Sequence, residues 1–205
     1  MSCRTLTNIT KIDCDSNRGG LYTKVWAFKR SLLGTMQVDN EGSDSSAEND
    51  GVITLGWTGS TTPTQDLVTL NFRKQSSGLT SEGTIDDANG ISFVTSNLAL
   101  VFARQNIQKR MAVQTLALQE DLALIVRDAN GVNYFLGYND SVTATAFGAA
   151  TGTASTDANQ YTITLTDIST ELPYIVIDDD MVTLFRADWQ TGDLAATIGT
   201  EVVST

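Results

Sequence analysis

The sequence of 205 residues has no histidine, only two cysteines and only two prolines. Histidine is the commonest general base and the commonest metal ligand in proteins. Hydrolytic triads and zinc sites of the usual kinds therefore lack a key member. An active site would have to use carboxylates alone, and no two carboxylates stand out as a pair. We expect a protein without catalytic residues, cofactor or bound metal.

Positive charge is also scarce, because 13 lysines and arginines face 24 aspartates and glutamates, for a net charge of -11. Nucleic acid and anionic membranes would be repelled by such a chain. No apolar run approaches the roughly 20 residues that a membrane-spanning helix needs. The acid excess suits solubility, or a surface along which nucleic acid passes without binding. We expect no membrane partner and no specific DNA contact.

The two cysteines, Cys3 and Cys14, lie near the start, and no secretory signal is recognisable before them. We expect free thiols in a protein made in the cytoplasm. A bridge between them is the alternative, and it would need an oxidising environment.

The most readable stretch runs from residue 92 to residue 138. It has an alternating apolar segment (92–102), a helical segment (106–119) that Asn106 can cap, and two apolar runs (122–126 and 133–138) around Asn130-Gly131. Asn-Gly is the preferred pair for a two-residue hairpin turn. The pattern predicts strand, helix and hairpin in that order.

Further strands are expected on both sides of this stretch, over residues 21–28, 52–57, 67–74, 142–147, 161–165, 174–177 and 181–185. The strands at 52–57 and 67–74 are expected to form a hairpin, and residues 76–83 a loop. The sequence thus predicts a mainly β fold, a sandwich or barrel with one flanking helix at about residues 104–119. A single domain over residues 1–205 fits this length.

An acidic loop is expected at residues 34–51, where almost nothing is apolar. Its carboxylates do not match a calcium loop, because the sixth and twelfth residues from Asp39 are Asp44 and Asp50 instead of Gly and Glu. Three consecutive aspartates at 178–180 are interpreted as a solvated turn, and residues 188–205 as a tail ordered by a partner. We expect the long loop to dock on a neighbouring subunit through its acids, which are Asp39, Glu41, Asp44, Glu48 and Asp50.

The helix carries two separated apolar stripes on a 3.6-residue wheel. One consists of Ile107, Met111 and Leu118, and the other of Val113, Leu116 and Ala117. One stripe should pack on the protein's own sheet, and the other either enters the same core or contacts an adjacent protomer. Nearby cations would suit the acids of another copy; they are Arg104, Lys109 and Arg110.

Two groups of features resemble virion structural proteins of tailed phages that infect Bacteroidota. The first is Cys3, then Cys14-Asp15-Ser16, then Gly19-Gly20-Leu21 before an aromatic strand. The second, in the same order as in those proteins, is 127–131, 134–137, Thr151-Gly152 with Asp157, 161–165 and Glu171-Leu172-Pro173. The resemblance covers about half of the chain.

Within that family the chain is most like a tail-tube protein. The resemblance implies a β-sandwich or barrel flanked by a helix, assembled with identical copies and other virion proteins into stacked hexameric rings with an acidic lumen for DNA. A head-to-tail connector ring and a capsid decoration protein are alternatives within the virion. A carbohydrate-binding adhesin is an alternative from another class, with Trp26, Trp57 and Trp189 as stacking platforms.

Overall fold

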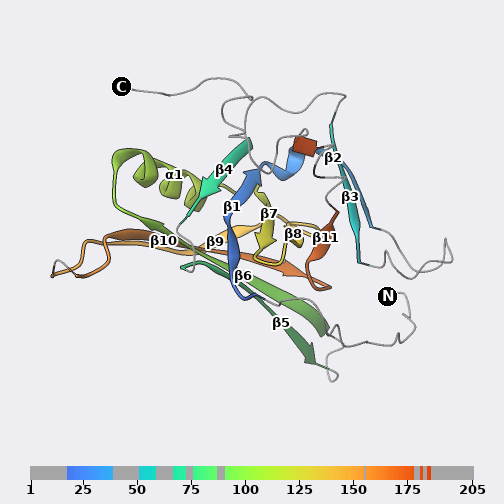
Figure 1. Cartoon of the computed structure of the whole chain (residues 1–205). Coiled ribbons are helices and arrows are strands. Elements are labelled where there is room, and N and C mark those ends of the chain that lie inside the picture. The colour runs from blue at the N-terminus through green and yellow to red at the C-terminus, as the bar shows by residue number, and fades with distance from the viewer. Residues whose placement is uncertain are drawn as a thin grey trace.

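The computed structural model describes residues 18–38, 51–58, 67–72, 76–86, 91–154 and 156–177, together with Met181, Leu184 and Phe185. These residues form three β-sheets and one longer helix (Figure 1). The predicted fold class, a mainly β sandwich with one flanking helix, is confirmed. The elements in chain order are β1 Leu21–Phe28, a 3-10 turn Arg30–Leu32, β2 Leu33–Val38, β3 Ile53–Trp57, β4 Leu67–Asn71, β5 Gly78–Asp86, β6 Ile91–Ala103, α1 Ile107–Leu118, β7 Ala123–Asp128, β8 Asn133–Leu136, β9 Thr143–Ala150, β10 Gln160–Ser169 and β11 Tyr174–Val176.

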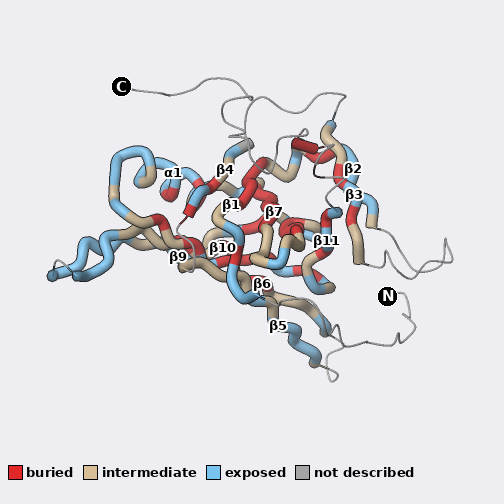
Figure 2. Tube along the Cα trace, in the orientation of Figure 1, coloured by how far each residue is buried: buried red, intermediate tan, exposed pale blue. Residues whose placement is uncertain are grey.

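A five-stranded sheet in the order β11-β8-β7-β1-β4 lies in the middle of the molecule. The second half of β1 and the first four residues of β7 are buried on both faces, and Figure 2 shows this buried centre in red. A strand with both faces covered needs a continuous apolar sequence instead of an alternating one. The run Leu122 to Val126, in which every residue is buried, meets this requirement.

A four-stranded antiparallel sheet in the order β5-β6-β10-β9 packs against one face of the central sheet. The core between them takes Leu124 and Val126 from β7, Leu98 and Leu100 from β6, and Val113 and Leu116 from α1 among others. Helix α1 closes this core beside β9 and β10 (Figure 1).

The two-stranded sheet β2-β3 covers the other face of the central sheet, where a second core lies. Trp26 and Phe28 of β1 point into it, whereas Val25 and Ala27 point into the first core. Trp26 stacks on Phe185 with ring centroids 6.0 Å apart. Two tryptophans of the predicted stacking platforms, Trp26 and Trp57, are thus part of this core, and the Trp57 indole N–H donates to the carbonyl oxygen of Leu184 at 3.0 Å.

Several local predictions are wrong, and each failure has a physical reason. The loop predicted from residue 34 begins later, because residues 33–38 form β2 and place Leu33, Met36 and Val38 against the second core. The strands at 52–57 and 67–74 do not pair with each other, since β3 pairs with β2 and β4 pairs with β1. The predicted hairpin is replaced by pairing of β3 with the preceding strand β2, and of β4 with β1, which is distant in sequence.

Residues 76–83 were predicted as a loop but belong largely to β5, an edge strand. Its sequence is polar because only one neighbour, β6, and one partly covered face support it. Residues 181–185 were predicted as a strand, but Met181, Leu184 and Phe185 are helical and buried. Their spacing of three and four residues is the helical one.

The predicted hairpin is confirmed, since β7 pairs with β8 around Asn130-Gly131. The predicted turn type is wrong. A two-residue type I′ turn needs positive φ at both central residues, and here Gly131 has φ +96° whereas Asn130 has no positive φ. The turn is longer and is held by the Asp128 carboxylate, which accepts from the backbone N–H groups of Asn130 at 2.9 Å and Val132 at 2.8 Å.

Candidate interaction surfaces

Helix α1 begins after Asn106, whose side-chain oxygen accepts a hydrogen bond from the Lys109 backbone N–H at 2.8 Å. This confirms the predicted cap. The helix packs on the core through Val113 and Leu116, with Ala117 partly buried beside them. One of its two predicted stripes therefore lies on the protein's own core, as expected.

The other stripe does not enter that core. Ile107, Met111 and Leu118 are 78%, 61% and 74% exposed, respectively, on the side of α1 opposite Val113 and Leu116. Exposed large apolar side chains that line up on one helix face typically mark a contact with another molecule. The stripe remains the best candidate among the predicted interface residues.

The cations near α1 have two different roles. Arg104 and Arg110 are exposed, whereas the Lys109 ammonium donates to the carbonyl oxygens of Ala103 and, at 3.3 Å, of Arg104. Lys109 thus satisfies backbone acceptors at the end of β6. Arg104 and Arg110 are thus the exposed cationic residues next to α1 in the described ranges.

The segment between β6 and α1 is held in an uncommon conformation. Arg104 has φ +62°, the one positive φ among the non-glycine residues in the described ranges. Its backbone N–H donates to the Asn159 carbonyl at 2.7 Å, and the Gln105 side chain donates to the Ala150 carbonyl at 2.9 Å. Arg104 is therefore fixed against the ends of β9 and β10.

The loop between β9 and β10, which carries part of the phage-like pattern, is organised by Asp157. Its carboxylate accepts from the N–H groups of Thr153 at 2.7 Å and Ala154 at 2.8 Å, and these bonds lower the pKa of the carboxyl. A Cβ on Gly152, which has φ +74°, would lie 2.4 Å from the Asp157 Cβ. The conformation of this loop thus accounts for a glycine at position 152 and an aspartate at position 157.

A shallow pocket of about 350 Å³ separates α1 from edge strand β9. Arg110 and Gln114 of the helix and Phe147 of β9 line it. Phe147 is 63% exposed and adds an apolar side chain on the sheet side of this pocket. The exposure of Phe147 could not be predicted from the sequence, because the residue pairs with the buried Ile163 and lies on the inner face of the sheet.

Apolar side chains are also exposed at the far end of the four-stranded sheet. Ile85 of β5 is 76% exposed, and Ile168 and Leu172 are mostly exposed as well. The acids Glu82 and Asp86 belong to the same end of β5. None of these residues was predicted as an interface residue.

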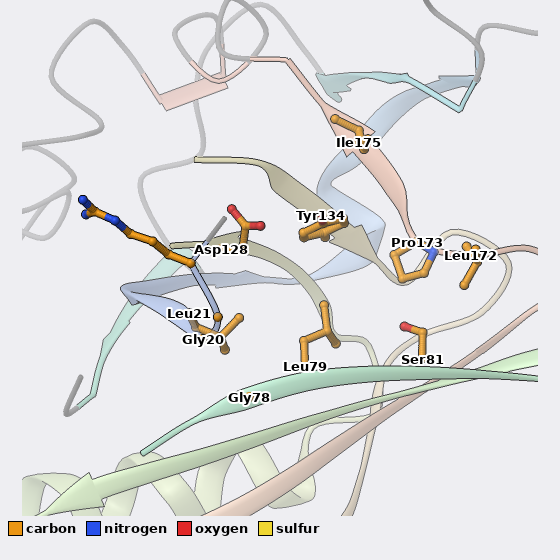
Figure 3. A pocket seen from close by; sticks show the side chains of 12 residues that line it. Gly20, Leu21, Gly78, Leu79, Ser81, Asp128, Tyr134, Leu172, Pro173 and Ile175 are labelled. Carbon is orange, nitrogen blue, oxygen red and sulfur yellow. The ribbon is translucent and has the colours of Figure 1, made fainter. Parts of the chain in front are cut away.

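A groove of about 570 Å³ opens between β1, β5 and the segment before β11 (Figure 3). Leu79, Leu172 and Pro173 form apolar walls, and the Tyr134 side chain lies between them and Asp128. Burial raises the pKa of the Tyr134 hydroxyl, and the nearby Asp128 carboxylate raises it further. The groove is mostly apolar and has no paired acid and base suited to catalysis.

Other predicted residues lie outside the described ranges. They are the loop acids Asp39, Glu41, Asp44, Glu48 and Asp50, the cysteines Cys3 and Cys14, and Trp189. In the part of the chain that the structure describes, no three metal-ligating side chains come together, and no helix is both long and apolar enough to span a membrane.

Comparison with known proteins adds no identification. No family model, curated protein or solved structure matches this chain.

Proposed function

We propose that this protein is a non-enzymatic structural subunit that assembles with copies of itself, in a phage virion and most specifically in a tail tube. The observation that carries the proposal is the helix α1 with two apolar faces. One face packs on the core through Val113 and Leu116. On the opposite face, Ile107, Met111 and Leu118 are exposed to solvent.

Self-association would remove this second face from water. Burial of apolar surface contributes roughly 25 cal/mol per Å², and a monomer gains nothing from exposing such a stripe. The pocket at Phe147 and Arg110 adds area and charge beside it. A second copy of an acidic chain is a natural partner for the exposed arginines.

The edge strands of the two larger sheets also support self-assembly. The four-stranded sheet ends in β5 on one side and β9 on the other. The central sheet ends in β4 and in β11, and Ile175 of β11 already pairs with Val52 before β3. An edge strand leaves backbone N–H and C=O groups available for pairing with another chain. In a subunit made for assembly, neighbours can use these groups, and a tube of stacked rings is the form that the phage resemblance implies.

The hypothesis of a carbohydrate-binding adhesin requires exposed tryptophans as stacking platforms. Trp26 lies in the second core, and Trp57 packs against it. We therefore propose no carbohydrate-binding role. DNA passage through an acidic lumen and residence in the virion remain parts of the proposal that follow from the resemblance.

The test uses the purified full chain in size-exclusion chromatography with light scattering and in negative-stain electron microscopy. We expect rings or tubes for the wild type and monomers for the triple variant Ile107→Ser, Met111→Ser, Leu118→Ser. Because these side chains are exposed, circular dichroism and melting temperature should change little. Tyr22→Ser, at an exposed aromatic residue of β1, is the matched control and should assemble normally. A wild-type chain that stays monomeric at every concentration would overturn the proposal.

A further inference from the structure

We propose that copies associate head to tail along the four-stranded sheet, with the basic end of one copy against the acidic end of the next. The basic end is the start of α1 and comprises Arg104, Ile107, Arg110 and Met111. The acidic end is the far end of the sheet and comprises Glu82, Ile85, Asp86, Ile168 and Leu172. This inference depends on the self-assembly proposed above and specifies which two surfaces meet.

The two ends differ in sign of charge. Residues 104–119 contain three cations and no acid, although acids outnumber cations in the whole chain. Strand β5 contains Glu82 and Asp86 and no cation. Opposite charge on two surfaces of one chain guides the encounter of identical copies and disfavours contacts between like ends.

The strand registers place these two surfaces at opposite ends of the sheet. Ala103, which precedes Arg104, pairs with the first residue of β10, Gln160. Toward the other end, Glu82 and Ile168 both pair with Thr95 of β6 and so form one row on one face of the sheet. Ile168 lies eight positions after Gln160 on β10, which corresponds to roughly 26 Å at about 3.3 Å per residue. In Figure 1, α1 and the tip of β5 accordingly lie far apart.

Both ends also expose apolar side chains, so charge is not the only complementary feature. Ile107 and Met111 are exposed at the basic end, and Ile168 and Leu172 are exposed at the acidic end. Ile85 is exposed at that end too, but it pairs with Ser92 and so lies on the opposite face from Glu82 and Ile168. Apolar side chains beside charges give an interface with a desolvated centre and a polar rim. Each contact of this type uses a different surface on each partner.

Head-to-tail contact has a structural consequence. A copy that binds through its basic end still has its acidic end free, so association continues into an open chain or closes into a ring. A symmetric dimer formed through one end alone would bring like charges together. Contact between the two different ends therefore favours extended or ring-shaped assemblies over a dimer of that kind.

The closing experiment is a charge-reversal cycle on the full chain, Arg110→Glu, Glu82→Arg and the double variant, measured by light scattering and sedimentation at low and at physiological salt. Each single variant should lower the apparent association constant by about 10-fold, and the double variant should recover a substantial part of it. Wild-type association should weaken as salt rises, because salt screens exposed charges. Matched controls are Lys24→Glu and Glu120→Arg, which should leave association unchanged.

The outcomes separate this inference from the proposed function. If the wild type does not associate, both fail. If the wild type associates and both single reversals associate equally well, the head-to-tail pairing is wrong while self-assembly stands. A third variant replaces the acids of residues 39–50 by the corresponding amides. If that variant and Arg110→Glu weaken association while Glu82→Arg does not, the partner of the basic end is the acidic loop and the pairing proposed here is overturned.

Discussion

The central five-stranded sheet and the four-stranded sheet differ in how many of their faces the fold covers. Strands β1 and β7 have side chains in both cores, whereas β6 and β10 bury one face through Leu98, Leu100 and Ile163. On their other face, residues such as Val101 and Thr164 are only partly covered. The central sheet is therefore structural on both sides, and the four-stranded sheet retains surface that evolution can adapt to partners.

The largest expected effect tests this contrast with alanine substitutions at neighbouring positions. Leu124→Ala and Ile125→Ala, on opposite faces of β7, should each lower the free energy of unfolding by about 2–5 kcal/mol, because both side chains are fully buried. On β6, Leu100→Ala should cost as much, but Val101→Ala clearly less. Chemical denaturation measures all four. Equal losses at Leu100 and Val101 would show that the second face is covered too.

The next effect concerns the close approach of the β7 and β8 segments within the central sheet. Gly137 follows β8 with φ +105°, and a Cβ there would lie 3.2 Å from the Cα and Cβ of Ala123. Gly137→Ala should therefore destabilise the fold by roughly 1–3 kcal/mol through strain and contact. Gly131→Ala, at a similar φ of +96° but beside the flexible end of Arg127, is the control and should cost less. A reversed order would contradict the close approach of the β7 and β8 segments.

A third prediction uses a buried carboxyl between the two sheets. Asp167 of β10 is 3% exposed, and its Oδ1 has no hydrogen-bond partner. Burial raises the pKa of this carboxyl above its ordinary value of 3.8, while the Gly137 N–H and the Arg30 guanidinium lower it and Asp140 raises it. The protonated form is thus favoured in the folded state. The Asp167 carboxyl therefore makes its full contribution to the free energy of unfolding below pH 3.8. This contribution is lost as pH rises through the raised pKa.

Asp167→Asn removes this titration and keeps the shape. As pH increases, the free energy of unfolding of the wild type should fall relative to that of the variant, because only the wild type has a titrating carboxyl at this position. The other carboxyls are common to both proteins and cancel in the comparison. Urea denaturation at several pH values between 4 and 8 provides the measurement. A difference that is independent of pH would show that Asp167 is charged in both states or exposed.

The smallest expected effect is the change in stability when a threonine is replaced by valine, once in each sheet. Thr166 Oγ1 of β10 donates to the Asn97 side chain at 2.8 Å, whereas Thr69 Oγ1 of β4 is buried without a partner. Thr166→Val should cost about 1 kcal/mol, and Thr69→Val should be neutral or stabilising. Thermal denaturation of both variants is sufficient. Destabilisation by Thr69→Val would imply a partner for its hydroxyl.

Much of the fold was predictable, and the successes share a cause. The helix with its Asn106 cap, the β7-β8 hairpin and the strands near 21–28 and 161–165 all depend on residues close in sequence. Apolar periodicity, a capping side chain and turn residues are local signals. The exposed stripe at Ile107, Met111 and Leu118 was also visible as a pattern, although the pattern could not tell whether the core would cover it.

The failures share a cause as well. Strand β5 is polar and exists because β6 offers it an edge, and β3 pairs with β2 because the second core needs a cover. The exposure of Phe147 and Ile85 depends on where neighbouring elements stop. None of these features is encoded within a window of ten residues.

Local sequence thus determined the mainly β class, the single long helix, its two apolar stripes and the segregation of charge along the chain, since periodicity and composition act over short distances. Tertiary structure decided which strands pair, why the central sheet has two cores, and that basic and acidic ends lie at opposite ends of one sheet. Pairing between distant strands depends on the total burial of the folded chain, and no single segment contains that quantity.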